Sequence, residues 1–141
     1  MMLCRLAVLE DAHELKRLND LFNGDNCNGL EKIAASLENN QQEIVCVLEN
    51  EALLIGFCCA QIFKSMCYDV NYGEITELFI LESFRHKGLG KKLLAFTEEA
   101  LMKQEIKGFQ LFTGQENNAA QQFYRTCGYK ETSEMMFRKR L

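Results

Sequence analysis

The sequence contains no proline, so glycine and asparagine residues have to mark its turns. It also contains no apolar run that approaches the roughly 20 residues needed for a membrane-spanning helix. The first residues, Met1 to Val8, lack the basic segment and long apolar stretch of a secretory signal. These absences predict a cytoplasmic protein that is not inserted in a membrane, and they leave Met1–Val8 as a first strand.

The cysteines form no recognisable framework. Their number is odd, their spacing is irregular and no C-x-x-C occurs, which argues against disulfides and against a zinc site. The only two histidines, His13 and His86, are far apart, so we expect no metal. We expect the cysteines in apolar runs to act as small buried hydrophobes in a reducing cytoplasm: Cys46, Cys58 and Cys59.

Size and charge limit the function further. A chain of 141 residues with 48% apolar and 26% charged residues is typical of one globular domain, which we place at residues 1–141. The net charge of −4 argues against nucleic-acid binding, which depends on neutralising phosphates. An acidic cleft would instead favour a cationic amine as substrate.

The periodicity of apolar residues predicts an α/β protein (an α+β mixed sheet) in the order β-α-α-β-β-β-α-β-α-β-β. Asp11 and Glu14 have the spacing of a capping box at the first helix, and Gly128 follows the last one. Two hairpins and a β-α-β crossover imply a mixed, mostly antiparallel sheet flanked by helices. The expected helices are Asp11–Phe22, Leu30–Glu38, Gly88–Gln104 and Asn117–Cys127. The later expected strands are Glu43–Leu48, Ala52–Phe63, Glu74–Leu81, Gly108–Thr113, Tyr129–Thr132 and Met135–Leu141.

The most informative segment is the strand Glu74–Leu81 followed by Arg85-His-Lys-Gly-Leu-Gly90. Glycines expose backbone N–H groups, and the start of a helix adds partial positive charge, so this turn can hold an anion such as a phosphate. A dinucleotide-binding turn, with the pattern G-x-G-x-x-G, is excluded because Leu93 occupies the position of its third glycine. A Walker A loop is also excluded, because Lys92 replaces its Ser or Thr.

The R-x-x-G-x-G pattern that remains resembles the acetyl-CoA-binding motif of the GCN5-related N-acetyltransferase (GNAT) superfamily. A second signature of that family follows on the next helix, where Asn117-Asn-Ala-Ala-Gln-Gln-Phe-Tyr124-Arg-Thr-Cys-Gly-Tyr129 matches N-x-x-A-x-x-F-Y-x-x-x-G-[FY]. The resemblance extends from Glu74 to Tyr129, and the expected element order agrees with the family over nearly the whole chain.

The resemblance implies which residues contact acetyl-CoA. The turn would bind the pyrophosphate, and the backbone of the preceding strand would pair with the pantetheine arm where this strand separates from the next one. Without the resemblance, the basic residues could equally be a solvated helix start, and Asn117 could be only a helix N-cap. The implied cofactor-binding residues are Leu78, Phe79, Ile80, Arg85, His86, Lys87, Gly88, Leu89, Gly90, Lys91 and Asn117.

The resemblance also implies catalytic roles. Tyr124 would ordinarily be a core tyrosine on an apolar helix face, but in many relatives this residue protonates the departing CoA thiolate. Glu74 and Glu77 are the two candidates for the base, with Glu74 slightly favoured, and either could act through water. Strand alternation places them on opposite faces of the sheet unless a bulge intervenes.

The implied function is an N-acetyltransferase that moves acetyl from acetyl-CoA to a primary amine of a small molecule or peptide, by direct attack in a ternary complex. The alternative is a non-catalytic acyl-CoA-binding or regulatory domain that has kept the cofactor turn. The family is often dimeric, so the resemblance also suggests a homodimer. Nothing in the segments expected to shape the acceptor site identifies the amine.

Overall fold

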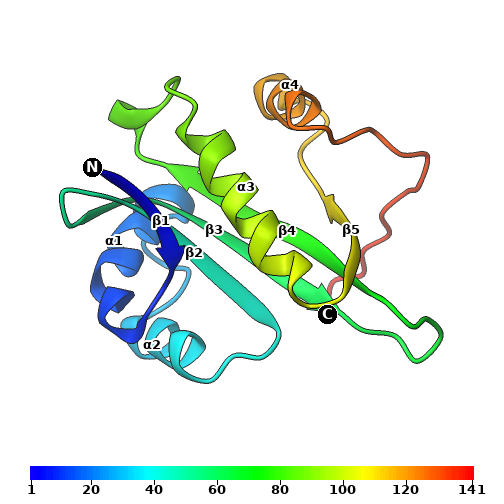
Figure 1. Ribbon diagram of the computed structural model, residues 1–141, viewed down its shortest axis with the longest axis horizontal. Helices are drawn as coiled ribbons and strands as arrows, with labels where there is room; N and C mark the ends of the chain where they lie inside the picture. The colour runs from blue at the N-terminus through cyan, green and yellow to red at the C-terminus, as the bar shows by residue number, and fades with distance from the viewer.

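The computed structural model describes all residues from Met1 to Leu141. Its core is a five-stranded sheet in which the strands lie in the order of the chain, and only the last pair is parallel (Figure 1). The predicted mixed, mostly antiparallel sheet is therefore confirmed. The strands are β1 (Met2–Leu6), β2 (Glu43–Asn50), β3 (Leu53–Phe63), β4 (Asn71–Ile80) and β5 (Ile106–Leu111). The helices are α1 (Ala12–Asn23), α2 (Leu30–Glu38), α3 (Leu89–Met102) and α4 (Asn118–Thr126).

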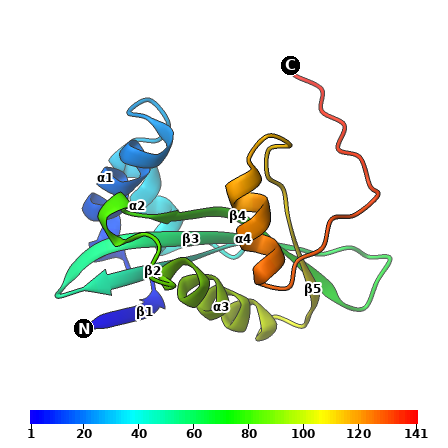
Figure 2. The ribbon, with the colours of Figure 1, turned by 90° about the horizontal axis from the view of Figure 1, so that it is seen from above.

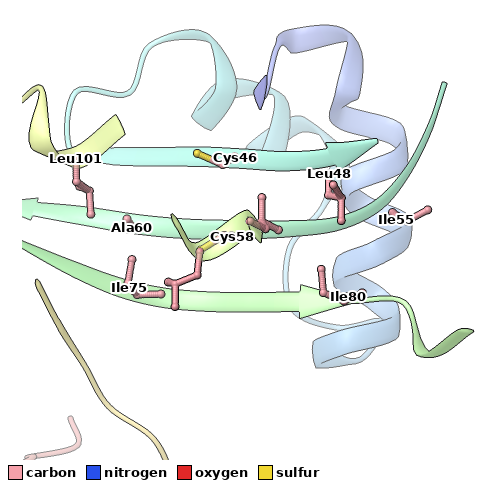
Figure 3. Packing of buried hydrophobic residues seen from close by; sticks show 10 residues of the cluster. Cys46, Leu48, Ile55, Cys58, Ala60, Ile75, Ile80 and Leu101 are labelled. Atoms are coloured by element: carbon pink, nitrogen blue, oxygen red, sulfur yellow. The ribbon is translucent and has the colours of Figure 1, made fainter. Parts of the chain in front are cut away.

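Helices cover both faces of the sheet. Helices α1 and α2 lie on one side and α3 lies on the other (Figure 2). Leu15 and Leu18 of α1 pack on Val47, Phe57 and Phe79 of the strands, and this side is called the α1 face below. The opposite side, the α3 face, buries a second cluster (Figure 3): Cys46, Leu48, Ile55, Cys58, Ala60, Ile75, Ile80, Leu93, Leu94 and Leu101.

Strand β3 lies between the two clusters, and its residues from Leu54 to Ala60 are all buried. Burial on both faces explains its continuous apolar sequence, because neither face of the strand meets water. The prediction that Cys46, Cys58 and Cys59 are buried hydrophobes is confirmed.

The start of the first helix differs from the predicted capping box. Asp11 accepts hydrogen bonds from the Val8 N–H at 2.8 Å and from both terminal nitrogens of Arg5 at 2.8 and 2.9 Å. Burial alone would raise the pKa of Asp11, but these bonds outweigh it and lower the pKa. Glu14 accepts from the Leu54 N–H at 2.8 Å and so ties α1 to β3. Both carboxylates are used in tertiary contacts, which is why the box does not form.

The predicted C-terminal hairpin is wrong. Residues 127–141 form no helix or strand, although Tyr129–Thr132 and Met135–Leu141 were expected as strands. The apolar side chains of this segment are largely exposed, with Phe137 87% accessible. A strand needs a partner for its backbone groups, and no other strand pairs with this segment. A second boundary also differs, because β4 starts at Asn71 and shortens the expected loop Lys64–Gly73.

No helix of the structure combines the length and the apolar character needed to cross a membrane.

Candidate active site

The predicted anion-binding turn lies between the end of β4 and the start of α3. His86 and Gly88 both have left-handed backbone conformations, with φ of 61° and 77°. Left-handed residues at this point let successive N–H groups converge on one spot. Gly88 is the N-cap of α3 and no side chain caps the helix, so its first N–H groups are free for an anion. The turn is therefore suited to an anion.

The basic side chains around the turn have partners of their own. Arg85 donates from Nε to the Ile80 carbonyl at 2.7 Å, and its guanidinium lies 5.5 Å from the centre of the Phe79 ring. The Nζ atom of Lys87 lies 5.5 Å from the centre of the Phe84 ring. Arg85 thus contacts the end of β4 through its hydrogen bond and through its cation–π contact with Phe79.

Strand β4 loses its neighbour halfway along its length. It pairs with β5 only from Asn71 to Ile75. In the rest of the strand, Thr76–Ile80, residues 77–80 pair with β3 and none pairs with β5. Figure 1 shows the two strands diverging, so that β4 leads to the start of α3 and β5 leads toward α4. This part of β4 is called the open edge below. Its unpaired backbone groups can bind an extended ligand as another strand would. Leu78, Phe79 and Ile80 all lie on it.

A β-bulge at Thr76 brings the two candidate bases to the same face. Cys59 pairs with Glu77 and its neighbour Ala60 pairs with Ile75, which leaves Thr76 without a partner. The alternation of β4 is therefore reset, and both Glu74 and Glu77 lie on the α1 face. The exception to strand alternation that was expected for a bulge therefore applies here, and the two carboxylates share one face.

Two further features surround these carboxylates. Across the sheet, register pairs form one polar row from β2 to β5: Glu43, Gln61, Glu74 and Gln110. Within it, Gln110 Nε2 donates to Glu74 Oε1 at 3.0 Å. Burial raises the pKa of Glu77, and burial together with the charge of Glu77 raises the pKa of Glu43. The sequence analysis missed Glu43, because only the strand register relates it to Glu77.

Helix α4 brings the second family signature to the opposite face. Asn117 caps the helix, with its Oδ1 accepting from the Ala120 N–H at 3.1 Å. The ring of Phe123 lies against Gly90, and a Cβ atom added to Gly90 would be 3.4 Å from that ring. Tyr124 packs against the α3-face cluster, and its hydroxyl makes no hydrogen bond to the protein. Burial first, then charges at Cys58, Cys127 and Glu77, raise the pKa of Tyr124 to about 12.

Comparisons with known proteins agree with this geometry. A model of the acetyltransferase (GNAT) family matches residues 9–129. An uncharacterised N-acetyltransferase of Chlorobaculum tepidum is 30% identical over 139 residues, which are 97% of this chain and 81% of that protein. The aminoglycoside acetyltransferase AAC(6')-Iy, solved with a CoA bisubstrate analogue, has a TM-score of 0.86 at 21% identity, covering 100% of this chain and 99% of that one. A ribosomal-protein-alanine N-acetyltransferase from Brucella melitensis biovar Abortus has a TM-score of 0.83 at 14% identity, and each chain is covered completely.

The chain belongs to the GNAT acetyltransferase family. It is an acetyl-CoA-dependent N-acetyltransferase, and the resemblance inferred from the two motifs is confirmed. Acetyl-CoA supplies an acetyl group that is activated as a thioester. The uncapped first turn of α3 and the open edge of β4 suit the diphosphate and the extended arm of this donor.

We expect Gly88→Glu to weaken CoA binding by at least about 10-fold, or about 1.4 kcal/mol. The new carboxylate would repel the diphosphate, and the left-handed φ of this residue strains any side chain. Isothermal titration with CoA measures the loss. Gly24→Glu is the matched control, because Gly24 also has a positive φ, of 90°, and lies in open space in another loop. Equal affinities for the two variants would rule out the turn as the diphosphate site.

We expect Glu43→Gln to raise the melting temperature at pH 7 and to change it much less at pH 4. A carboxyl whose pKa is raised by folding contributes its full stability only when protonated, and that contribution is lost as pH rises through the raised pKa. Gln keeps the size of Glu43 without its charge. Thermal melts at both pH values test this, with the exposed Glu116→Gln as control. The same shift at both pH values would show that the charge is not responsible.

Proposed function

We propose that the enzyme transfers the acetyl group of acetyl-CoA directly to a primary amine of a small molecule or peptide in a ternary complex. The observation that supports this proposal is the pair of proton-handling groups beside the open edge of β4. Glu77 lies on the α1 face and Tyr124 packs against the α3 face. A thioester bound along this edge would have a base on the side of the incoming amine and an acid on the side of the leaving sulfur.

The donor would be held by backbone groups. In this proposal, amides of the turn and of the first turn of α3 bind the diphosphate, and the backbone of Leu78, Phe79 and Ile80 pairs with the pantetheine arm. Asn117 uses its side-chain oxygen to cap α4, which leaves its amide nitrogen for the cofactor. The turn residues with this role are His86, Lys87, Gly88, Leu89, Gly90 and Lys91, with Arg85 supporting the end of β4.

Glu77 is the better candidate for the base. A carboxyl with a raised pKa accepts a proton more readily at neutral pH, and burial raises the pKa of Glu77. Glu74 instead accepts a hydrogen bond from Gln110. In the proposed step Glu77, directly or through water, removes a proton from the ammonium group, and the freed amine attacks the carbonyl carbon. A backbone N–H of the open edge would stabilise the oxyanion.

Tyr124 would then act as the general acid. With a pKa of about 12, its phenol keeps its proton at neutral pH, and no protein group competes for that proton. As the carbon–sulfur bond breaks, the electron pair goes to sulfur and the phenol donates its proton there. The tyrosine regains a proton as the new amide nitrogen loses its extra one through water. No covalent enzyme intermediate is needed, which agrees with the packing role of the buried cysteines.

Three carboxylates on the α1 face, Glu43, Glu74 and Glu77, favour an acceptor with positive charge. One solved relative acts on aminoglycosides and another on an alanine of a ribosomal protein. Both kinds of acceptor present an amine, and of the two the aminoglycoside type, with several ammonium groups, fits the carboxylates better. We therefore propose a small polycationic amine as the acceptor class.

Release of free thiol from acetyl-CoA, measured with a panel of amines, tests the proposed function. The panel should contain spermidine, an aminoglycoside and a peptide with a free N-terminal alanine, and mass spectrometry should identify the product. We expect amine-dependent thiol release and an N-acetylated product, with the polycations preferred over the peptide. Preference for the peptide would contradict the acceptor class, and thiol release that no amine stimulates would contradict transfer to an amine.

Tyr124→Phe tests the proposed acid. We expect kcat to fall roughly 10- to 1000-fold, because the leaving thiolate loses its proton donor, while the KM for acetyl-CoA changes little. Tyr68→Phe is the control, since Tyr68 is 74% exposed in the loop before β4. An unchanged kcat in Tyr124→Phe would remove this residue from the mechanism.

A further inference from the structure

We propose that Glu98 of α3 and Tyr129, just after α4, form a positioning pair that holds Tyr124 in place for proton transfer. This inference rests on the proposed role of Tyr124 as general acid. Neither Glu98 nor Tyr129 would touch the reacting atoms, and both would act through Tyr124.

The pair is joined by one short hydrogen bond. The Tyr129 hydroxyl donates to Glu98 Oε2 at 2.6 Å, and both side chains are half-buried. A hydrogen bond to a carboxylate is about twice as strong as one between neutral groups. Burial first, and then Glu98, raise the pKa of Tyr129, so its phenol stays protonated and remains a donor. Glu98 forms no ion pair that would compete for this carboxylate.

Tyr129 in turn holds Tyr124 at two points. The Tyr129 N–H donates to the Tyr124 carbonyl at 3.0 Å, and Gly128, with φ of 94°, makes the turn that permits this bond. The two rings meet edge to face, with centroids 5.9 Å apart and planes at 72°. Backbone and ring of Tyr124 therefore both depend on where Tyr129 lies.

Helix α4 has few other means of fixing its position. None of its residues is buried, although its apolar side chains Phe123 and Tyr124 pack against the α3-face cluster. Helix α3, in contrast, is anchored in the core by Leu93, Leu94, Thr97 and Leu101. The bond from Glu98 to Tyr129 ties the weakly buried helix to the well-buried one. It also joins the acid to the helix whose first turn would bind the diphosphate.

The hydroxyl of Tyr129 is a feature of this chain rather than a requirement of the motif. The family pattern accepts Phe or Tyr at this position, so packing alone does not need the hydroxyl. Here that hydroxyl is bound to a carboxylate on α3. A misplacement of about 1 Å at a reacting group can cost about 100-fold in rate, so a modest loosening of α4 would be visible in kcat.

Steady-state kinetics on four variants test the pair. We expect Tyr129→Phe and Glu98→Ala each to lower kcat by about 3- to 30-fold, below the about 100-fold cost of a full misplacement. The KM for acetyl-CoA should stay within about twofold, because the diphosphate turn is untouched. Glu98→Gln should recover most of kcat, since its amide oxygen can still accept the bond. Glu99→Ala, at the exposed next position on α3, is the matched control.

Combination with Tyr124→Phe separates a positioning role from a structural one. If the pair acts through the Tyr124 hydroxyl, Tyr129→Phe should lower kcat by less than about twofold once that hydroxyl is absent. Circular dichroism and CoA titration confirm that each variant is folded. Unchanged kcat in Tyr129→Phe and Glu98→Ala would overturn the inference while the proposed function stands. So would a double variant whose loss of kcat equals the product of the losses in Tyr129→Phe and Tyr124→Phe. If Tyr124→Phe itself leaves kcat unchanged, the assignment of the acid and this inference are both wrong.

Discussion

The site depends on one interruption of backbone pairing, the point where β4 and β5 part after Ile75. Up to that point β4 has a neighbouring strand on both sides, and beyond it residues 77–80 keep a partner only on β3. Unpaired strand edges are usually covered or blunted, because they invite pairing with any extended chain. In this enzyme a short connection, which contains a 3-10 turn at Glu82–Phe84 and the basic turn, joins the end of this edge to the uncapped start of α3. In the proposed binding mode, the extended arm of the donor lies along the edge and the diphosphate joined to it lies at the start of α3, so both meet backbone groups.

The bulge at Thr76 decides which side chains accompany this edge. Without the bulge, strand alternation would place Glu77 on the α3 face with Ile75, the face against which Tyr124 packs. In the proposed mechanism, the base and the acid would then lie on the same side of the bound donor. With the bulge, Glu77 lies on the α1 face beside Glu74 and Glu43. One inserted residue, Thr76, thus places Glu77 on one side of the sheet and leaves the ring of Tyr124 packed on the other. In the proposed mechanism this arrangement puts the base and the acid on different sides of the bound donor. Bulges are frequent next to active sites, where they re-aim a side chain in this way.

The sequence predicted the local features of the site well, because glycines and helix signatures act over a few residues. The turn at Gly88, the cap at Asn117 and the mixed sheet were all recoverable from spacing and from the family motifs. The bulge could not be predicted, because it is visible only in the register between β3 and β4 and not in the sequence of β4 alone. Glu43 was missed for the same reason. The C-terminal hairpin was predicted from the local apolar pattern. Such a pattern reflects strand propensity, but it does not show whether another strand lies beside the segment to pair with it.

The contrast between α3 and α4 explains how a small sheet can support precise chemistry. Helix α3 buries Leu93, Leu94 and Leu101 against the sheet, so it is anchored in the core. Helix α4 buries no residue fully and follows β5, the strand that has already left its neighbour. Two contacts return from this region to α3: the ring of Phe123 lies against Gly90, and the hydroxyl of Tyr129 donates to Glu98. In the proposed mechanism these contacts fix the position of the acid, Tyr124, relative to the helix whose first turn would bind the donor. Helix α3 would then support both the open edge for the ligand and the placement of the proposed acid.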